Sequence, residues 1–377
     1  MSGVSGNSRR GGPNLVRGGA LDALRFAAAF FIVLYHYGEN APVSLFELHP
    51  AFERGYLATN FFLMLSGFVL ASAYGPRLDE RRMGAIQFLK KRLARIYPAH
   101  LVMLLAFVAV FAAVSLLGLP LRNPQWFDWS QLPAQVLLVQ AWGLPGPSGW
   151  NIVTWSLSAL VFCYAVFPFA WRVLGRIGPW AGVAVAVGLF AAADAFTHAV
   201  LGYPVYQMPL QFGVLRALPL FLLGVTLARA ASLTTLPKPL AVLGTLGAFA
   251  AVIGLQLSGE RHDYLTVAAT GLMMFSAAVW RNDRSRVVAG LAAISFSLFI
   301  TNYFLGVVWF GALRVAADRL GLPAEAVWAA WAAALPAAIG FAWLFDRLVD
   351  QPLQALVNRM RPGRPEAAAT PAYQGAQ

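Results

Sequence analysis

The stretch LDALRFAAAFFIVLYHY, residues 21–37, decides the fold class. It reads as a membrane-crossing helix, because about 20 mainly apolar residues span the hydrocarbon core of a bilayer. It nevertheless carries Arg25 and His36, which lie eleven positions apart. That spacing is about three turns plus roughly 20°, so both side chains project from one helix face, about 16 Å apart along the axis. An ionisable residue at membrane depth is costly and therefore indicates a functional site.

The composition extends this interpretation to the whole chain. Of the 377 residues, 59% are hydrophobic and only 12% are charged, whereas a soluble domain carries about 25% charged residues. The single cysteine, Cys163, excludes an internal disulfide, and the sequence shows no His/Cys/Asp cluster with metal-ligand spacing, so we expect no metal site. The Arg-rich, Ala-rich composition is typical of a GC-rich bacterial genome.

Apolar runs predict an all-α, polytopic membrane protein with about ten transmembrane helices. A weaker apolar stretch near residues 134–142 predicts a re-entrant or surface helix. The ten expected spans are residues 21–37, 55–75, 96–118, 150–171, 179–201, 212–230, 237–257, 264–280, 287–311 and 325–346.

The distribution of basic residues predicts the orientation. The formal net charge is +12, but the cations lie in short loops and not along one face, which argues against nucleic-acid binding. Because cytoplasmic loops are enriched in Lys and Arg, the pattern places both termini in the cytoplasm and the protein in the bacterial cytoplasmic membrane. Arg25 and Arg216 fall within spans, and the expected outer segments hold only Arg54, Arg122, Arg261, Arg314 and Arg319.

Three regions follow from this topology. Residues 1–20 are expected to form a cytoplasmic segment, with no cleavage pattern after the first span, which should therefore remain as an anchor. Residues 21–352 form the transmembrane domain. Residues 353–377 are expected to be a cytoplasmic, disordered tail, because the final part is rich in Pro, Ala, Gly and Gln.

His36 is the first candidate for chemistry. A neutral imidazole in a water-lined cavity can take the proton of a hydroxyl that attacks a carbonyl. Arg25, three turns deeper and near the cytoplasmic surface, could pair with a phosphate or with Asp22. The alternative is a buried histidine that is hydrogen-bonded to a helix carbonyl.

The inner basic cluster before the third span is the second candidate. Arg92 and Arg95 present two guanidinium forks on one helix face at the headgroup level, a pattern that suits a polyphosphate. Lys91 lies beside them. Ordinary positive-inside anchoring to membrane lipids explains the same cluster without a ligand.

Polar residues inside other spans complete the candidates. Trp155, Ser156 and Ser158 open the fourth span, where hydroxyls can contact a polar substrate and a tryptophan can stack on a sugar ring. Helix packing and the interfacial aromatic belt explain them equally well. Arg216, which opens the sixth span, and the intramembrane amides Asn60 and Asn302 are further candidates for substrate contacts or interhelical hydrogen bonds.

Together these fragments resemble acyltransferase family 3, a family of integral membrane O-acyltransferases. The first span is similar to the family's arginine, ten residues, histidine signature. The sequence around Arg92 and Arg95, which continues Ile-Tyr-Pro, is similar to its double-arginine motif. Further matching fragments follow in the expected order: residues 60–68, residues 155–158, Arg216 with Pro219, Phe221 and Gly224, residues 294–298, and residues 350–352.

The resemblance implies acyl transfer, commonly of acetyl, from cytoplasmic acyl-CoA to a hydroxyl of an exported polysaccharide or lipid-linked glycan. It implies that His36 is the general base, and that Arg25, Arg92 and Arg95 handle the donor. A polysaccharide assembly machinery is an implied partner. Three positions depart from the family's pattern: Leu160 replaces a usual glutamate, Asn302 a common histidine, and Asp350 a glutamate. The missing glutamate removes a carboxylate that could orient the base or the acceptor.

Two other function classes fit the same composition. A transporter or flippase of a glycolipid or anionic solute would use the intramembrane polar residues as a translocation path, although the sequence shows no internal repeat. A non-catalytic scaffold in a polysaccharide assembly complex would tolerate the missing glutamate. Transfer or hydrolysis of labelled acyl-CoA distinguishes the enzyme from both.

Overall fold

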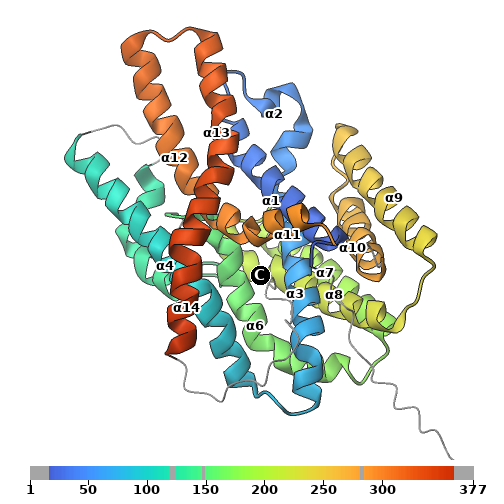
Figure 1. Ribbon diagram of the computed structural model, residues 1–377. Helices are drawn as coiled ribbons and strands as arrows, with labels where there is room; N and C mark the ends of the chain where they lie inside the picture. Colours follow the sequence, from blue (N-terminus) through green and yellow to red (C-terminus); the bar gives the residue numbers. More distant parts are fainter. Residues whose placement is uncertain (1–16, 119–123, 147–148, 281–283, 361–377) are drawn as a thin grey trace, which may run out of the picture.

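The computed structural model describes residues 17–118, 124–146, 149–280 and 284–360, and over these residues it is helical with no strand (Figure 1). The long helices are α1 (Ala20–Gly38), α3 (Tyr56–Asp79), α4 (Ala85–Leu116), α6 (Trp155–Leu174), α7 (Pro179–Leu201), α8 (Gly213–Leu233), α9 (Lys238–Leu257), α10 (Asp263–Val279), α12 (Ser295–Leu320) and α13 (Ala324–Phe345). The short elements are α2 (Leu45–Leu48), η1 (Pro50–Arg54), η2 (Pro124–Phe127), η3 (Trp129–Gln131), α5 (Leu132–Leu137), η4 (Ile152–Thr154), η5 (Leu210–Phe212), α11 (Arg286–Ala293), η6 (Asp346–Asp350) and α14 (Gln351–Arg359).

The predicted fold class is confirmed. In the described part of the chain, nine helical segments are long and apolar enough to cross a membrane. The remaining expected span, residues 264–280, corresponds to α10, a shorter apolar helix of 17 residues. At about 1.5 Å of rise per residue it reaches about 25 Å. The protein is therefore an all-α, polytopic membrane protein.

The ninth expected span was placed incorrectly. Residues 287–311 are divided between α11 and α12, with Ile294 between the two helices. Figure 1 shows α11 lying across the bundle, whereas α12 rises beside α13. Hydropathy detects the length of an apolar run but not a change in the direction of the chain. The membrane-spanning helix α12 therefore begins at Ser295, eight residues later than predicted.

Two segments expected to be loop or tail are helical. Residues 85–95 form the first three turns of α4, because Lys and Arg are good helix formers and Phe88 and Ile96 are buried along the same helix. Residues 353–359, expected to be disordered, belong to α14. Pro352 lies in its first turn, where a missing N–H leaves no bond unmade. Residues 1–16 and 361–377 lie outside the described residues.

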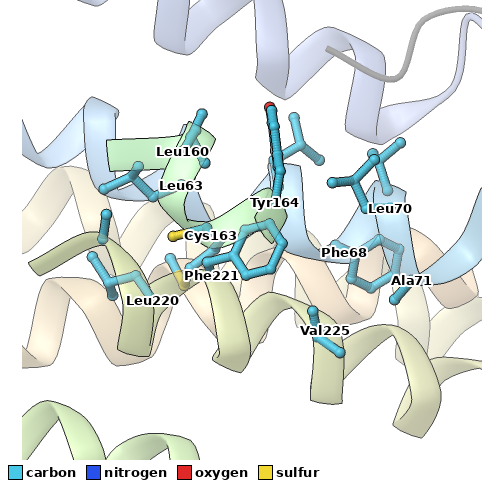
Figure 2. Close-up of a cluster of buried hydrophobic side chains, with 14 of the residues drawn as sticks. Leu63, Phe68, Leu70, Ala71, Leu160, Cys163, Tyr164, Leu220, Phe221 and Val225 are labelled. Carbon is cyan, nitrogen blue, oxygen red and sulfur yellow. The ribbon is translucent and has the colours of Figure 1, made fainter. Parts of the chain in front are cut away.

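The core of the bundle is the contact between α3 and α8, which Figure 2 shows together with α6. Gly67 of α3 meets the carbonyl of Phe221, and Gly224 of α8 meets the carbonyl of Met64, so that a Cβ atom at either glycine would overlap that carbonyl. Small residues allow helix backbones to approach closely in membranes. Phe68, Phe221 and their neighbours then fill the space on both sides of this crossing.

The described residues between α4 and α6 fold back along α4. Phe127 stacks on Phe111 of α4, whereas Leu137, at the end of α5, accepts a hydrogen bond from Tyr97. Phe111 and Tyr97 are fourteen residues apart on one helix, so the segment descends by about 21 Å. It then returns, because the backbone N–H of Trp150 donates to the carbonyl of Trp126. The re-entrant interpretation of residues 134–142 is thus supported by these contacts.

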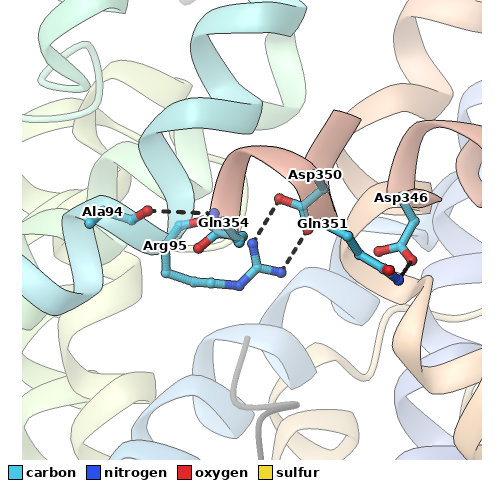
Figure 3. A network of polar contacts seen from close by, with 6 residues as sticks. All are labelled: Ala94, Arg95, Asp346, Asp350, Gln351 and Gln354. Atoms are coloured by element: carbon cyan, nitrogen blue, oxygen red, sulfur yellow. Dashed lines mark hydrogen bonds and ion pairs between the residues drawn. The ribbon is translucent and has the colours of Figure 1, made fainter. Parts of the chain in front are cut away.

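The helix α13 continues through a π-helical turn, η6, into α14, which lies against α4. At this contact Arg95 makes two parallel bonds, of 2.8 and 2.9 Å, to the carboxylate of Asp350 (Figure 3). The amide of Gln354 donates to the carbonyl of Arg95 over 2.9 Å, and so fixes the start of α14 to the same turn of α4.

A candidate active site at the end of helix α1

His36 lies in the last turn of α1 and is held by Asn302 of α12. Its Nδ1 is 2.6 Å from Oδ1 of Asn302. The Asn302 amide nitrogen donates to the carbonyls of Leu298 and Phe299, at 3.0 and 2.7 Å. These two carbonyls fix the orientation of the amide, so its oxygen must face the imidazole. His36 therefore carries its proton on Nδ1, and Nε2 keeps an accepting lone pair.

His36 opens onto a cavity of about 830 Å³. Aromatic residues form much of the wall: Tyr35, Phe46, Tyr56, Phe107, Phe111, Trp126, Phe127, Trp155, Phe299, Tyr303 and Phe310. The rings of Tyr35 and Tyr303 contact the imidazole directly, with centroids at 5.2 and 5.6 Å. The cavity lies toward the end of the bundle that the loop charges assign to the outer side. It is large enough for a small polar molecule or one sugar residue beside an acyl thioester.

Arg216 projects into the same cavity from α8. Its Nε donates to Oδ1 of Asn60 over 2.8 Å, and one terminal nitrogen donates to the carbonyl of Tyr56 over 2.8 Å. The guanidinium lies 5.5 and 5.6 Å from the ring centroids of Tyr56 and Trp155. Four of the candidate residues, His36, Asn302, Arg216 and Asn60, are therefore brought together as two supported pairs, with Trp155 at the wall.

Arg25 shares the helix face of His36 but not its cavity. Its side chain is 5% exposed and donates to the carbonyl of Ala292, at the end of α11. From the shared helix face we expected both side chains to face one water-accessible cavity. That expectation was wrong, because α11 crosses the bundle at the level of Arg25 and buries it. Neither side chain points outward from the bundle: Arg25 is buried and His36 lines the cavity.

The inner basic residues also lie outside the cavity. Arg92 donates to the hydroxyl of Tyr74 over 2.7 Å, and its guanidinium lies 4.7 Å from the centre of that ring. Arg95 is paired with Asp350. Lys91 is half-buried beside them. Arg92 and Arg95 thus lie near one another on α4, as predicted, and neither lines the cavity of His36.

The two serines of the fourth-span motif have structural partners. The Ser156 hydroxyl donates to the carbonyl of Val153, and the Ser158 hydroxyl accepts from the backbone N–H of Ala141 over 3.0 Å. Both side chains are buried, and neither lines the cavity. Ser66, considered above only as part of a motif, contacts the hydroxyl of Tyr164 at 3.2 Å within the core.

Sequence reasoning missed several residues of the cavity wall. Arg314 and Arg319 were assigned to an outer loop, but α12 continues to Leu320 and carries both along the cavity. Tyr56 precedes Asn60 by one helical turn, a spacing that could have indicated a shared face. Phe127, in the re-entrant segment, carries no sequence signal of its position.

Comparison with known proteins now identifies the family. The family model Acyl_transf_3, described as an acyltransferase domain, matches residues 19–347. The chain belongs to this family. The matched range contains every residue of the cavity and the Arg92–Arg95 pair. The resemblance to this family is confirmed, and the chain is an integral membrane member of the acyltransferase family.

Two curated relatives are similar to parts of this family 3 member. Acyltransferase MdmB of Streptomyces mycarofaciens is 35% identical over 190 residues, which cover 46% of this chain and 46% of that protein. Protein 2 in the picA locus of Rhizobium radiobacter is 43% identical over 100 residues, which cover 26% of this chain and 49% of that protein. The matches span about half the length of each relative. No solved structure matches the chain.

Proposed function

We propose that the protein is an O-acyltransferase that uses cytoplasmic acyl-CoA, in the first instance acetyl-CoA, to acylate a hydroxyl of an exported polysaccharide or lipid-linked glycan. The observation that carries this proposal is the fixed tautomer of His36. Asn302 holds Nδ1 as a donor, so Nε2 is the atom that can accept a proton from a molecule in the cavity.

The reaction follows from that geometry. An acceptor hydroxyl in the cavity gives its proton to Nε2 of His36 while its oxygen attacks the thioester carbonyl carbon. The tetrahedral intermediate collapses, the C–S bond breaks, and the coenzyme A thiolate takes the proton back from the imidazolium. His36 returns to its neutral form, and the products are an ester and the free thiol. Asn302 acts as a positioning residue, because its side chain bonds to the imidazole and to two backbone carbonyls and does not line the cavity.

The donor would enter from the cytoplasmic end, where Arg92, Arg95 and Lys91 offer cations for its phosphates, with Arg25 deeper in the bundle. Arg95 is paired with Asp350 in this structure. A donor phosphate would therefore have to replace that carboxylate. The positive-inside distribution of the loops supports placing these arginines on the cytoplasmic face of the bacterial inner membrane.

The purified full-length protein in lipid nanodiscs, with acetyl-CoA, provides the direct test. We expect release of coenzyme A thiol that increases when a glycan acceptor is added. The His36→Ala variant should insert and fold normally but lose the release by at least about a hundredfold, since general-base catalysis contributes about 10²–10⁴. Val287→Ala, at an exposed position of α11, is a control variant away from the cavity.

The same experiment tests the transporter alternative. A transporter leaves the thioester intact, so an unchanged acetyl-CoA pool with every acceptor, combined with acceptor movement across the bilayer, would reject the enzyme. Near-normal turnover in His36→Ala would reject the role of the imidazole. Mass analysis of surface glycans, with and without the gene, then identifies the acylated product and any polysaccharide assembly partner to examine.

A further inference from the structure

The cavity around His36 is positively charged, although the outer side of the protein is otherwise poor in cations. Three arginines line it, Arg216 in the wall and Arg314 and Arg319 on the last turns of α12. Glu39 is the only acidic residue among the described lining residues. The sequence predicts six basic residues on this side, the five of the outer segments and Arg216, and three of them lie at this one cavity.

Arg216 is the most constrained of the three. Its residue is only 5% exposed. A guanidinium has five N–H donors. Three of them are used: Nε to Asn60, and one on each terminal nitrogen, to the carbonyl of Tyr56 and, at 3.4 Å, to the carbonyl of Tyr206. One N–H on each terminal nitrogen remains, a pair that matches two oxygens of a carboxylate or phosphate.

The partners of Arg216 provide no opposite charge by direct contact. All three are neutral oxygens, and no ion pair joins Arg216 to a carboxylate within the described residues. The carboxylate of Asp263 is linked to Arg216 through Tyr56, whose hydroxyl donates to both carboxylate oxygens, at 2.9 and 3.0 Å. A buried charge is costly unless it is paired, and Arg216 lines a cavity in which an anion could pair with it.

We propose that the acceptor is an anionic molecule, whose carboxylate or phosphate binds Arg216 while one of its hydroxyls lies at His36. Arg314 and Arg319, both exposed at the end of α12, attract the same negative charge toward the cavity. The proposal rests on the proposed function only in placing the acceptor in the His36 cavity. The charge of the acceptor is a separate claim and has a separate test.

Binding in the absence of donor tests the charge directly. A glucuronic-acid trisaccharide and its methyl ester have the same hydroxyls and nearly the same shape, but only the first is anionic. A trisaccharide phosphate provides the second source of negative charge. Affinities are measured by calorimetry with the full-length protein in nanodiscs of neutral lipid, at low and at moderate salt, because exposed charges are screened as salt increases.

Three variants locate the binding group. Arg216→Gln removes the buried cation. The double variant Arg314→Gln, Arg319→Gln removes the exposed pair and should fold normally, because both side chains lie at the surface. Arg261→Gln is the matched control: Arg261 is also on the expected outer side and half-exposed, but it pairs with Glu53 and does not line the cavity.

We expect the wild-type protein to bind the uronate or the phosphate at least about tenfold more tightly than the methyl ester, since hydrogen bonds to a charged group are stronger than those to a neutral ester. Arg216→Gln should abolish this preference, the double variant should reduce it and its salt dependence, and Arg261→Gln should retain it. If Arg216→Gln does not fold, the double variant decides the question.

Three results would overturn the proposal. The first is equal binding of the charged and methylated sugars by the wild-type protein. The second is a preference for the charged sugar that survives in Arg216→Gln and in the double variant. The third is an unchanged affinity combined with an equal loss of kcat on both sugars in Arg216→Gln, which would place Arg216 at the developing oxyanion. Failure of the proposed function appears differently, as absence of thiol release with every acceptor, whatever the binding results.

Discussion

Asn302 fixes the tautomer of His36: its oxygen lies 2.6 Å from Nδ1, while its amide nitrogen is held by the carbonyls of Leu298 and Phe299. The resemblance noted above implies a histidine at this position in many relatives, and asparagine is a departure from that pattern. An amide cannot ionise. His36 is therefore the single titratable group of the His36–Asn302 pair, and the backbone of α12 sets the orientation of the Asn302 amide.

The Asn302→Leu variant tests this relationship. Loss of the Nδ1 acceptor leaves both tautomers of His36 available and its ring free to rotate, so we expect kcat to fall by about ten- to a hundredfold with little change in KM. The measurement is acyl transfer by the purified protein over a range of acceptor concentrations. The control is Thr301→Val, one position earlier, where a buried hydroxyl bonds only to the backbone of Ser297. Equal kcat values for the two variants would contradict the positioning role.

The Arg95–Asp350 pair should contribute to stability at the contact of α4 with α14. The Asp350 side chain is 3% exposed and that of Arg95 is 23% exposed. Asp350→Asn removes the charge but keeps the shape, so we expect a loss of about 1–3 kcal/mol, less than for a fully buried pair because Arg95 is partly solvated. Thermal unfolding in detergent measures this loss. Glu80→Gln breaks the exposed pair with Arg82 and should have an effect near zero.

The crossing of α3 and α8 predicts an intolerance of added volume. Gly67→Ala would place a methyl group against the carbonyl of Phe221, which belongs to the backbone and cannot rotate away. We expect a loss of at least about 1–3 kcal/mol, or failure to fold. Gly247→Ala, in α9, meets nothing within 4 Å and should be neutral or slightly stabilising. Monodispersity on size-exclusion chromatography and thermal stability compare the two. Similar behaviour of both variants would show that the crossing is looser than described.

The depth of the re-entrant segment can be measured by labelling. Cysteines introduced at Ser130 and at Leu137 lie at the upper part and the tip of this segment, and the native Cys163 is buried, so it should give little background. We expect a membrane-impermeant maleimide to label Ser130→Cys from outside intact cells and to leave Leu137→Cys unlabelled, because an apolar side chain exposed at that depth faces lipid. Rapid labelling of both positions would place the segment in water.

The sequence predicted most of the helical architecture, because hydropathy over about 20 residues is a direct physical requirement of the bilayer. It predicted less well where tertiary contacts determine the path. The break at Ile294 and the continuation of the chain through η6 into α14 leave no signal in composition. The descent of residues 124–137 was weakly indicated, since its apolar run is short.

The candidate site shows the same division. His36, Asn302, Arg216 and Asn60 stood out individually, because polar groups are rare at membrane depth. Their pairing could not be predicted, since it joins residues 266 positions apart in one case and 156 in the other. Arg25 was grouped with His36 from helical periodicity alone, which describes a shared face but not the neighbouring helix that covers part of it.

The re-entrant segment also bears on how the topology of the chain is counted. A segment that enters and leaves through the same face of the membrane adds no crossing. Residues 124–154 therefore do not change whether the number of spans is odd or even. The side of the membrane that the charges assign to each later loop is unchanged as well. Reporter fusions before Pro124 and after Trp150 should therefore signal the same compartment, even though the chain between them reaches the level of Tyr97.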